Sequence, residues 1–159
     1  MTKKYYPLIL AVIYLMFLSV PMSMAADKKP VEVRKSDKCP VCGMFVAGYK
    51  NWLAEIIFTD GSYVAFDGPK DMFRYYLNVK KFTPAKSASD ISNIYVTEYY
   101  STGLMDARKV FFVQGSDVNG PMGAELVPLA TEAAAKSFLK DHKGSRILKF
   151  NEVTTENLK

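Results

Sequence analysis

The chain has 159 residues, the size of one ordinary domain, and its formal net charge of +5 is spread over dispersed lysines. This charge is too small and too scattered to favour nucleic-acid binding, so we expect no nucleic-acid partner. With one histidine, and without a serine-nucleophile, phosphate-loop or zinc-protease motif, the chain shows no catalytic constellation, and we expect it not to be an enzyme.

The N-terminus has the layout of a secretory signal peptide. Two lysines precede an apolar run over 8–20, and small residues follow it. We therefore predict a signal peptide over residues 1–25, cleaved after about Ala25 or Ala26, and a periplasmic protein. An uncleaved anchor is the alternative, although the run is shorter than the roughly 18 apolar residues of a membrane-spanning helix. Because no cysteine lies near the cleavage site, we expect no lipid anchor.

Charged residues without periodicity occupy 26–38 and predict a surface tether. The segments 52–58 and 62–66 are rich in β-forming residues and flank Asp60-Gly61, which predicts a hairpin. Asp67 stands where it would cap a helix over 69–79, and a strand is expected over 93–100.

The same order of elements follows in the rest of the chain. We expect a strand over 109–113, a loop over 115–123, a strand over 124–129, a helix over 131–142 capped by Thr131, and a strand over 146–153. The prediction is therefore an α+β fold with two ββαβ-type halves, one over 39–103 and the other over 104–159. A single α+β sheet with two helices on one face has the same element order and stays an alternative.

The sequence signal with the most chemical content is the run Cys39-Pro40-Val41-Cys42-Gly43-Met44, which holds the only two cysteines. Pro40 and Gly43 favour a tight turn that directs both sulfur atoms toward one ion. Thiolate and thioether sulfur are the ligands that Cu(I) prefers. Met44 lies within the run, and Met122 lies in a Gly-Pro-Met-Gly segment with little core to fill. We therefore predict a Cu(I) site with Cys39, Cys42, Met44 and Met122 as candidate ligands.

Other uses of a Cys-x-x-Cys pair remain open. A c-type haem site is excluded because Gly43 stands where a histidine is required. A thiol–disulfide oxidoreductase requires a thiolate of lowered pKa, and no helix clearly begins after Cys42. A structural zinc site requires four ligands, which here means His142 with a carboxylate, or a second subunit. His142 is expected in the last turn of a helix, where histidines are common. A plain disulfide between Cys39 and Cys42 would stabilise the fold only weakly.

The order of motifs resembles the NosL family of nitrous oxide reductase accessory proteins. The likeness rests on the cysteine run over 39–46, the segments 52–56, 64–73 and 95–100, and the Pro-Met-Gly segment over 121–123. It implies a periplasmic Cu(I)-binding protein with two ββαβ-type halves, which passes copper to an acceptor protein or to a membrane assembly complex for nitrous oxide reductase. By position, the family's copper-binding role falls on Cys39, Cys42, Met44 and Met122.

The sulfur turn and the later Tyr-Val-Ala-Phe also resemble the YHS and TRASH metal-binding modules. Those modules usually carry another cysteine after the phenylalanine, whereas this chain has Asp67 there. This departure argues against a TRASH-type zinc site. We therefore expect Cys39 and Cys42 to supply the binding strength and Met44 or Met122 to complete the copper shell.

Overall fold

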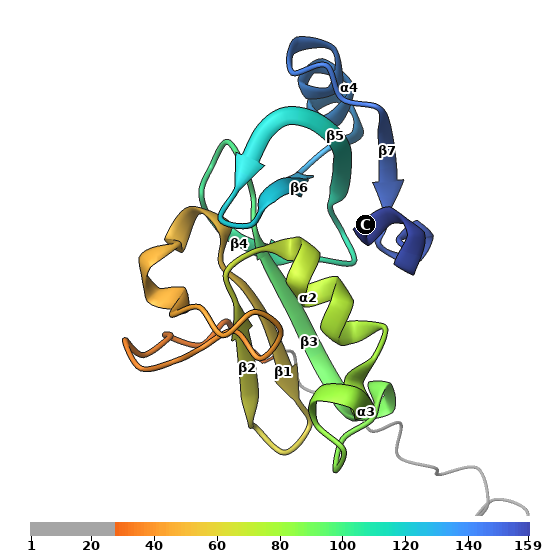
Figure 1. Cartoon of the computed structure of the whole chain (residues 1–159). Coiled ribbons are helices and arrows are strands. Elements are labelled where there is room, and N and C mark those ends of the chain that lie inside the picture. Colours follow the sequence, from red (N-terminus) through yellow and green to blue (C-terminus); the bar gives the residue numbers. More distant parts are fainter. Residues whose placement is uncertain (1–27) are drawn as a thin grey trace, which may run out of the picture.

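The computed structural model describes residues 28–159, so the predicted signal peptide lies outside the described residues. The fold is α+β, with two small antiparallel sheets and helices packed on them (Figure 1). The single-sheet alternative is therefore wrong. Among residues 28–159, no helix combines the length and the apolar character needed to cross a membrane.

The first sheet has four strands in the order β2-β1-β3-β4. Its strands are β1 (Ala54–Phe58), β2 (Tyr63–Phe66), β3 (Ile91–Thr97) and β4 (Leu104–Asp106). The expected hairpin forms with Ile57 opposite Tyr63, and Gly61 takes a left-handed φ of +89° in its turn. β4 was not predicted. It starts at the first residue of the predicted second half but pairs with β3 in the first sheet.

The helix expected over 69–79 is divided in two. α2 (Pro69–Tyr76) and α3 (Val79–Phe82) are separated at Asn78, whose φ of −140° is not helical. The Asn78 side chain donates a hydrogen bond to the Arg74 carbonyl instead. Asparagine commonly competes with the helical backbone in this way.

The second sheet has three strands in the order β6-β5-β7. Its strands are β5 (Phe111–Gly120), β6 (Gly123–Leu129) and β7 (Arg146–Lys149), and α4 (Glu132–Asp141) lies between β6 and β7 in the chain. The Thr131 side chain caps α4 as predicted, by accepting a hydrogen bond from the Ala134 N–H. The strand expected over 146–153 ends at Lys149, and a 3-10 helix follows it. The 3-10 helices are η1 (Val46–Gly48), η2 (Lys50–Trp52), η3 (Ala88–Asp90), η4 (Phe150–Glu152) and η5 (Thr155–Leu158).

The loop predicted over 115–123 is wrong, because this segment forms the hairpin between β5 and β6. β5 continues to Gly120, the chain turns at Pro121 and Met122, and Gly120 pairs with Gly123. A register irregularity between Gln114 and Asn119, with Gly115 in a left-handed conformation, marks a bulge. This segment is polar, so it lacks the apolar alternation that identifies a strand in sequence. Its place in the sheet comes from backbone pairing, which the sequence pattern does not reveal.

Helix α2 lies between the two sheets (Figure 1) and contributes to a core that both sheets share. Phe73 of α2 packs edge-on against Phe112 of β5, with ring centroids 5.0 Å apart. A smaller apolar cluster centres on Phe138 under α4. The described part of the predicted tether is hydrogen-bonded to the first sheet. Lys28 Nζ donates to the Phe58 carbonyl, and the Val31 N–H donates to Glu55.

Candidate metal centre

Residues 38–45 form a tight knuckle that carries both cysteines. An isolated antiparallel bridge between Lys38 and Phe45 closes it. Inside the knuckle the Cys39 N–H donates to the Met44 carbonyl at 2.8 Å, and the Gly43 N–H donates to the Cys39 carbonyl at 2.8 Å. Gly43 has a φ of +80°, a left-handed conformation that glycine adopts without the strain of a side chain. The predicted turn is therefore present at the predicted residues.

The knuckle brings each thiol to a carboxylate of a distant segment. Cys39 Sγ donates to Asp71 Oδ2 at 3.4 Å, and Cys42 Sγ donates to Asp67 Oδ1 at 3.2 Å. Asp67 follows β2, and Asp71 lies in the first turn of α2. Ligand atoms from these four residues all lie within 4.8 Å of one another. Two sulfur and two oxygen donors can therefore surround a single ion.

Burial controls the protonation of the two thiols. It raises the pKa of Cys39 far above that of a free cysteine and raises the pKa of Cys42 to about 11. The nearby carboxylates add to this effect, because they accept hydrogen bonds from the neutral thiols. Both cysteines are free thiols. The cluster thus holds protonated thiols that donate to Asp67 and Asp71, and the plain disulfide is not formed.

Asp67 has an oxygen that no group within residues 28–159 satisfies. Its side chain is 1% exposed, and Oδ2 has no hydrogen-bond partner among the described residues. By contrast, Asp71 Oδ1 accepts a hydrogen bond from Arg74 at 2.8 Å. A buried carboxylate oxygen without a partner is costly, and a bound cation would compensate that cost. The orphaned oxygen therefore supports a metal site on chemical grounds.

The structure places the other predicted ligands differently. Met44 lies within the knuckle and is half-buried, whereas Met122 lies at the β5–β6 turn and is 45% exposed. Their role as ligands stays a prediction. His142 is not in the group of four donors, because its Nδ1 lies 3.1 Å from Asp117 Oδ1 and its ring stacks on Phe138.

Sequence reasoning missed the two carboxylates. Asp67 was expected to cap α2, but Gly68 is the residue at the N-cap and no side chain of the cap residue bonds to the helix. The expectation that Asp67 is a cap is therefore wrong. The one available signal was its position, since Asp67 stands where the TRASH modules carry a cysteine. Asp71 gave no signal, because its contact with Cys39 comes from tertiary packing across 32 residues.

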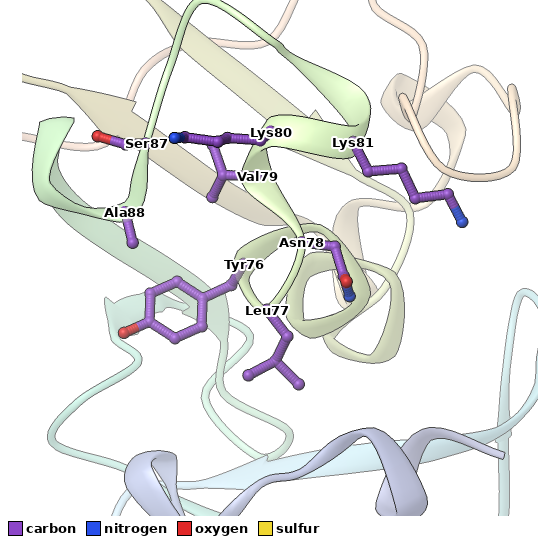
Figure 2. Close-up of a pocket in the computed structure, with 8 residues that line it drawn as sticks. All are labelled: Tyr76, Leu77, Asn78, Val79, Lys80, Lys81, Ser87 and Ala88. Carbon is purple, nitrogen blue, oxygen red and sulfur yellow. The ribbon is translucent and has the colours of Figure 1, made fainter.

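A cavity of about 370 Å³ lies away from the cysteines. Figure 2 shows its lining around the junction of α2 and α3, where Lys80 points toward Ser87 and Lys81 points away from both. The cavity is lined by Tyr76, Leu77, Asn78, Val79, Lys80, Lys81, Ser87 and Ala88. It therefore lies at the C-terminal end of α2, whereas the four-donor cluster lies at its N-terminal end.

Comparison with known proteins identifies similar sequences and folds. A family model described as NosL matches residues 30–158. The copper-binding lipoprotein NosL of Stutzerimonas stutzeri is 30% identical over 127 residues, which cover 79% of this chain and 66% of that protein. The crystal structure of the copper chaperone NosL from Shewanella denitrificans has a TM-score of 0.67 at 19% identity, and the match covers 81% of this chain and 98% of that chain. This last likeness concerns the fold.

The Stutzerimonas relative is named a lipoprotein. Its lipid anchor conflicts with the expectation that this chain has none. That expectation came from the position of the cysteines, which in this chain are Cys39 and Cys42. The matched segment begins at residue 30, so it leaves the preceding residues outside the family model.

Proposed function

The chain belongs to the NosL family, and we propose that it is a periplasmic Cu(I)-binding protein that delivers copper for the assembly of a copper enzyme, nitrous oxide reductase. The observation that carries this proposal is the pair of free thiols in a four-donor cluster of which three residues are buried and Cys42 is half-buried. Soft sulfur donors favour Cu(I), which also accepts low coordination numbers. The proposed role is binding and transfer, without catalysis.

Cys39 and Cys42 supply the binding strength in this proposal, and a thioether from Met44 or Met122 completes the shell. Met44 belongs to the same knuckle as the thiols. The turn that carries Met122 lies near the N-terminus of α2, because the Ala124 carbonyl, two residues later, accepts a hydrogen bond from Lys70 Nζ. Cys42 is half-buried whereas Cys39 is 1% exposed, so Cys42 is the sulfur that an acceptor reaches first.

The acceptor in this proposal is a copper-receiving protein or a membrane assembly complex. When copper passes from one protein to another, a ligand of the acceptor replaces one ligand of the carrier while a second ligand of the carrier still holds the ion. One accessible and one buried sulfur meet this requirement. Export follows from the predicted signal peptide and agrees with the lipoprotein name of the Stutzerimonas relative.

The finer description of the fold is also a proposal. We assign residues 39–103 and 104–159 to two ββαβ-type halves. In support, β1 lies between β2 and β3 in the first sheet, and β5 lies between β6 and β7 in the second. β4, at the start of the second half, departs from this pattern because it pairs with β3 of the first sheet.

Zinc binding is the second candidate function, and one observation favours it. Asp67 and Asp71 provide the carboxylates that the sequence did not reveal, and two thiolates with two carboxylates make a four-ligand set of the kind that zinc accepts. A structural zinc site predicts unfolding on chelation. The oxidoreductase alternative loses support, because burial raises the pKa of both thiols.

The proposal is tested by replacing both cysteines with serine. We expect the wild-type chain to bind one Cu(I) and the Cys39→Ser/Cys42→Ser variant to bind none in anaerobic titration against a Cu(I) chelator. Circular dichroism checks that the variant is folded. His142→Ala is the matched control, because this residue lies outside the cluster, and it should bind like the wild type. Undiminished Cu(I) binding by the double serine variant would reject the assigned site.

A further inference from the structure

The first turn of α2 obtains its cap from the other sheet. Gly68 at the N-cap has no side chain, so the N–H groups of the first turn require an acceptor from elsewhere. Glu125 of β6 provides it. Its Oε1 accepts a hydrogen bond from the Lys70 N–H at 2.6 Å and another from the Leu126 N–H at 2.9 Å. A carboxylate 55 residues away in sequence thus caps the helix that carries Asp71.

Two glycines make room for this carboxylate. A Cβ at Gly68 would lie 2.3 Å from Glu125 Oε2, and a Cβ at Gly120 would lie 3.0 Å from Glu125 Cγ. Neither glycine has a left-handed φ, so space rather than backbone conformation explains them. The surroundings of Glu125 are therefore fitted to its side chain, which is buried.

Lys70 donates a second hydrogen bond to the same strand. Lys70 Nζ donates to the Ala124 carbonyl, while the Lys70 N–H donates to the neighbouring Glu125. Lys70 is itself buried. The start of β6 is thus attached to the first turn of α2 by two hydrogen bonds. Both come from Lys70, which stands between Asp67 and Asp71 in the sequence.

We propose that Glu125 is a positioning residue of the metal centre, because its hydrogen bond to the first turn of α2 holds Asp67 and Asp71 against the sulfur atoms of Cys42 and Cys39. Glu125 itself is not a ligand in this proposal. The hairpin that carries Met122 also carries Glu125, so the same hydrogen bonds attach this hairpin to the first turn of α2. Partners of metal ligands commonly change metal affinity by about 10- to 100-fold when they are lost.

Three variants separate positioning from general stability. Glu125→Ala removes the acceptor, and a neighbouring cavity of about 190 Å³ gives the surroundings room to relax. Glu125→Gln keeps the volume and a carbonyl acceptor for the Lys70 N–H. Glu98→Ala is the matched control, because Glu98 is a buried carboxylate that accepts backbone hydrogen bonds from Tyr100 and Ser101 on a different loop.

Two measurements are made on each variant. The Cu(I) affinity, from anaerobic chelator competition, rests on the proposed function. The alkylation rate of Cys42 by iodoacetamide in the copper-free chain, followed by mass spectrometry, does not. We expect Glu125→Ala to weaken Cu(I) binding by about tenfold and to accelerate alkylation, because the Cys42 thiol loses its ordered carboxylate partner. Glu125→Gln should stay near wild type on both measurements, and Glu98→Ala should lower stability without changing either.

The proposal is overturned if Glu125→Ala leaves the alkylation rate unchanged, if Glu98→Ala changes it equally, or if Glu125→Gln behaves like alanine. A wild-type chain that fails to bind Cu(I) would reject the proposed function but leave the alkylation test valid. If the alanine variant does not fold, Glu125→Asp replaces it. Aspartate keeps the charge but withdraws the carboxylate from the Lys70 N–H, so it should also accelerate alkylation.

Discussion

Each cysteine of the cluster is paired with its own buried aspartate, Cys39 with Asp71 and Cys42 with Asp67. In the copper-free state the carboxylates accept hydrogen bonds from neutral thiols, so the cluster avoids placing four negative charges in one buried site. Cu(I) binding requires thiolates and therefore releases the thiol protons. The pairing makes the copper-free site stable and also makes its metal affinity depend on pH.

We predict that the apparent Cu(I) affinity rises with pH. The pKa of Cys42 is raised to about 11 and that of Cys39 is raised further, so both thiols are protonated between pH 6 and 8. Each proton released on binding increases the affinity by about tenfold per pH unit, or about 100-fold for two. Chelator competition at pH 6, 7 and 8, corrected for the chelator's own protonation, measures this slope. An affinity independent of pH would show that the thiols are already ionised.

At the residue scale, sequence analysis identified the sulfur donors but not the oxygen donors. Cys39 and Cys42 were evident because they lie in one short motif with its turn residues. Asp67 and Asp71 are separated from their sulfur partners by 25 and 32 residues. No local pattern marks a contact that forms only when α2 packs against the knuckle.

Among the elements, the first turn of α2 carries one of the four residues of the candidate site. It contains Asp71, begins two residues after Asp67, and receives its cap from β6. Helices usually obtain this cap from a side chain at the N-cap. Here the cap residue is glycine, and the helix begins correctly only when the second sheet is in place. The start of α2 thus depends on the fold of both predicted halves.

Gly68→Ala is predicted to destabilise the fold. Its new Cβ would lie 2.3 Å from Glu125 Oε2, and crowding of this kind typically costs about 1–3 kcal/mol. Gly48→Ala is the control, because a Cβ there has no atom within 4 Å. Urea unfolding should show a lower free energy of unfolding for the first variant and a value near wild type for the second. Equal stability of the two variants would contradict the close packing between Gly68 and Glu125.

The predictability of the elements followed their apolar content. The β1–β2 hairpin and α4 were predicted because apolar periodicity and a turn or cap marked them. The β5–β6 hairpin was missed over 115–123, a polar segment in which the pairs of Asn119 with Ala124 and of Gly120 with Gly123 close the hairpin through the backbone. β4 was missed because it has only three residues, Leu104–Asp106.

At the scale of the whole molecule, the knuckle that carries both cysteines packs into the shared core. Cys39 and Val46 belong to the same apolar cluster as Phe73 of α2 and Phe112 of β5. The repeated element order predicted two sheets, and two antiparallel sheets form, but the first also includes β4 from the predicted second half. The ordering of residues 28–31 was not predictable, because their contacts are hydrogen bonds to the first sheet made by a charged segment.

The central claim is that this buried cluster binds Cu(I) in preference to zinc. The most direct test is an anaerobic titration of the reduced chain without its predicted signal peptide. The chain competes with a chelator for Cu(I) and, in a parallel experiment, with a chelator for Zn(II). The account predicts tight binding of one Cu(I) per chain and much weaker binding of Zn(II). Tighter binding of zinc, or binding of neither metal by fully reduced protein, would contradict it.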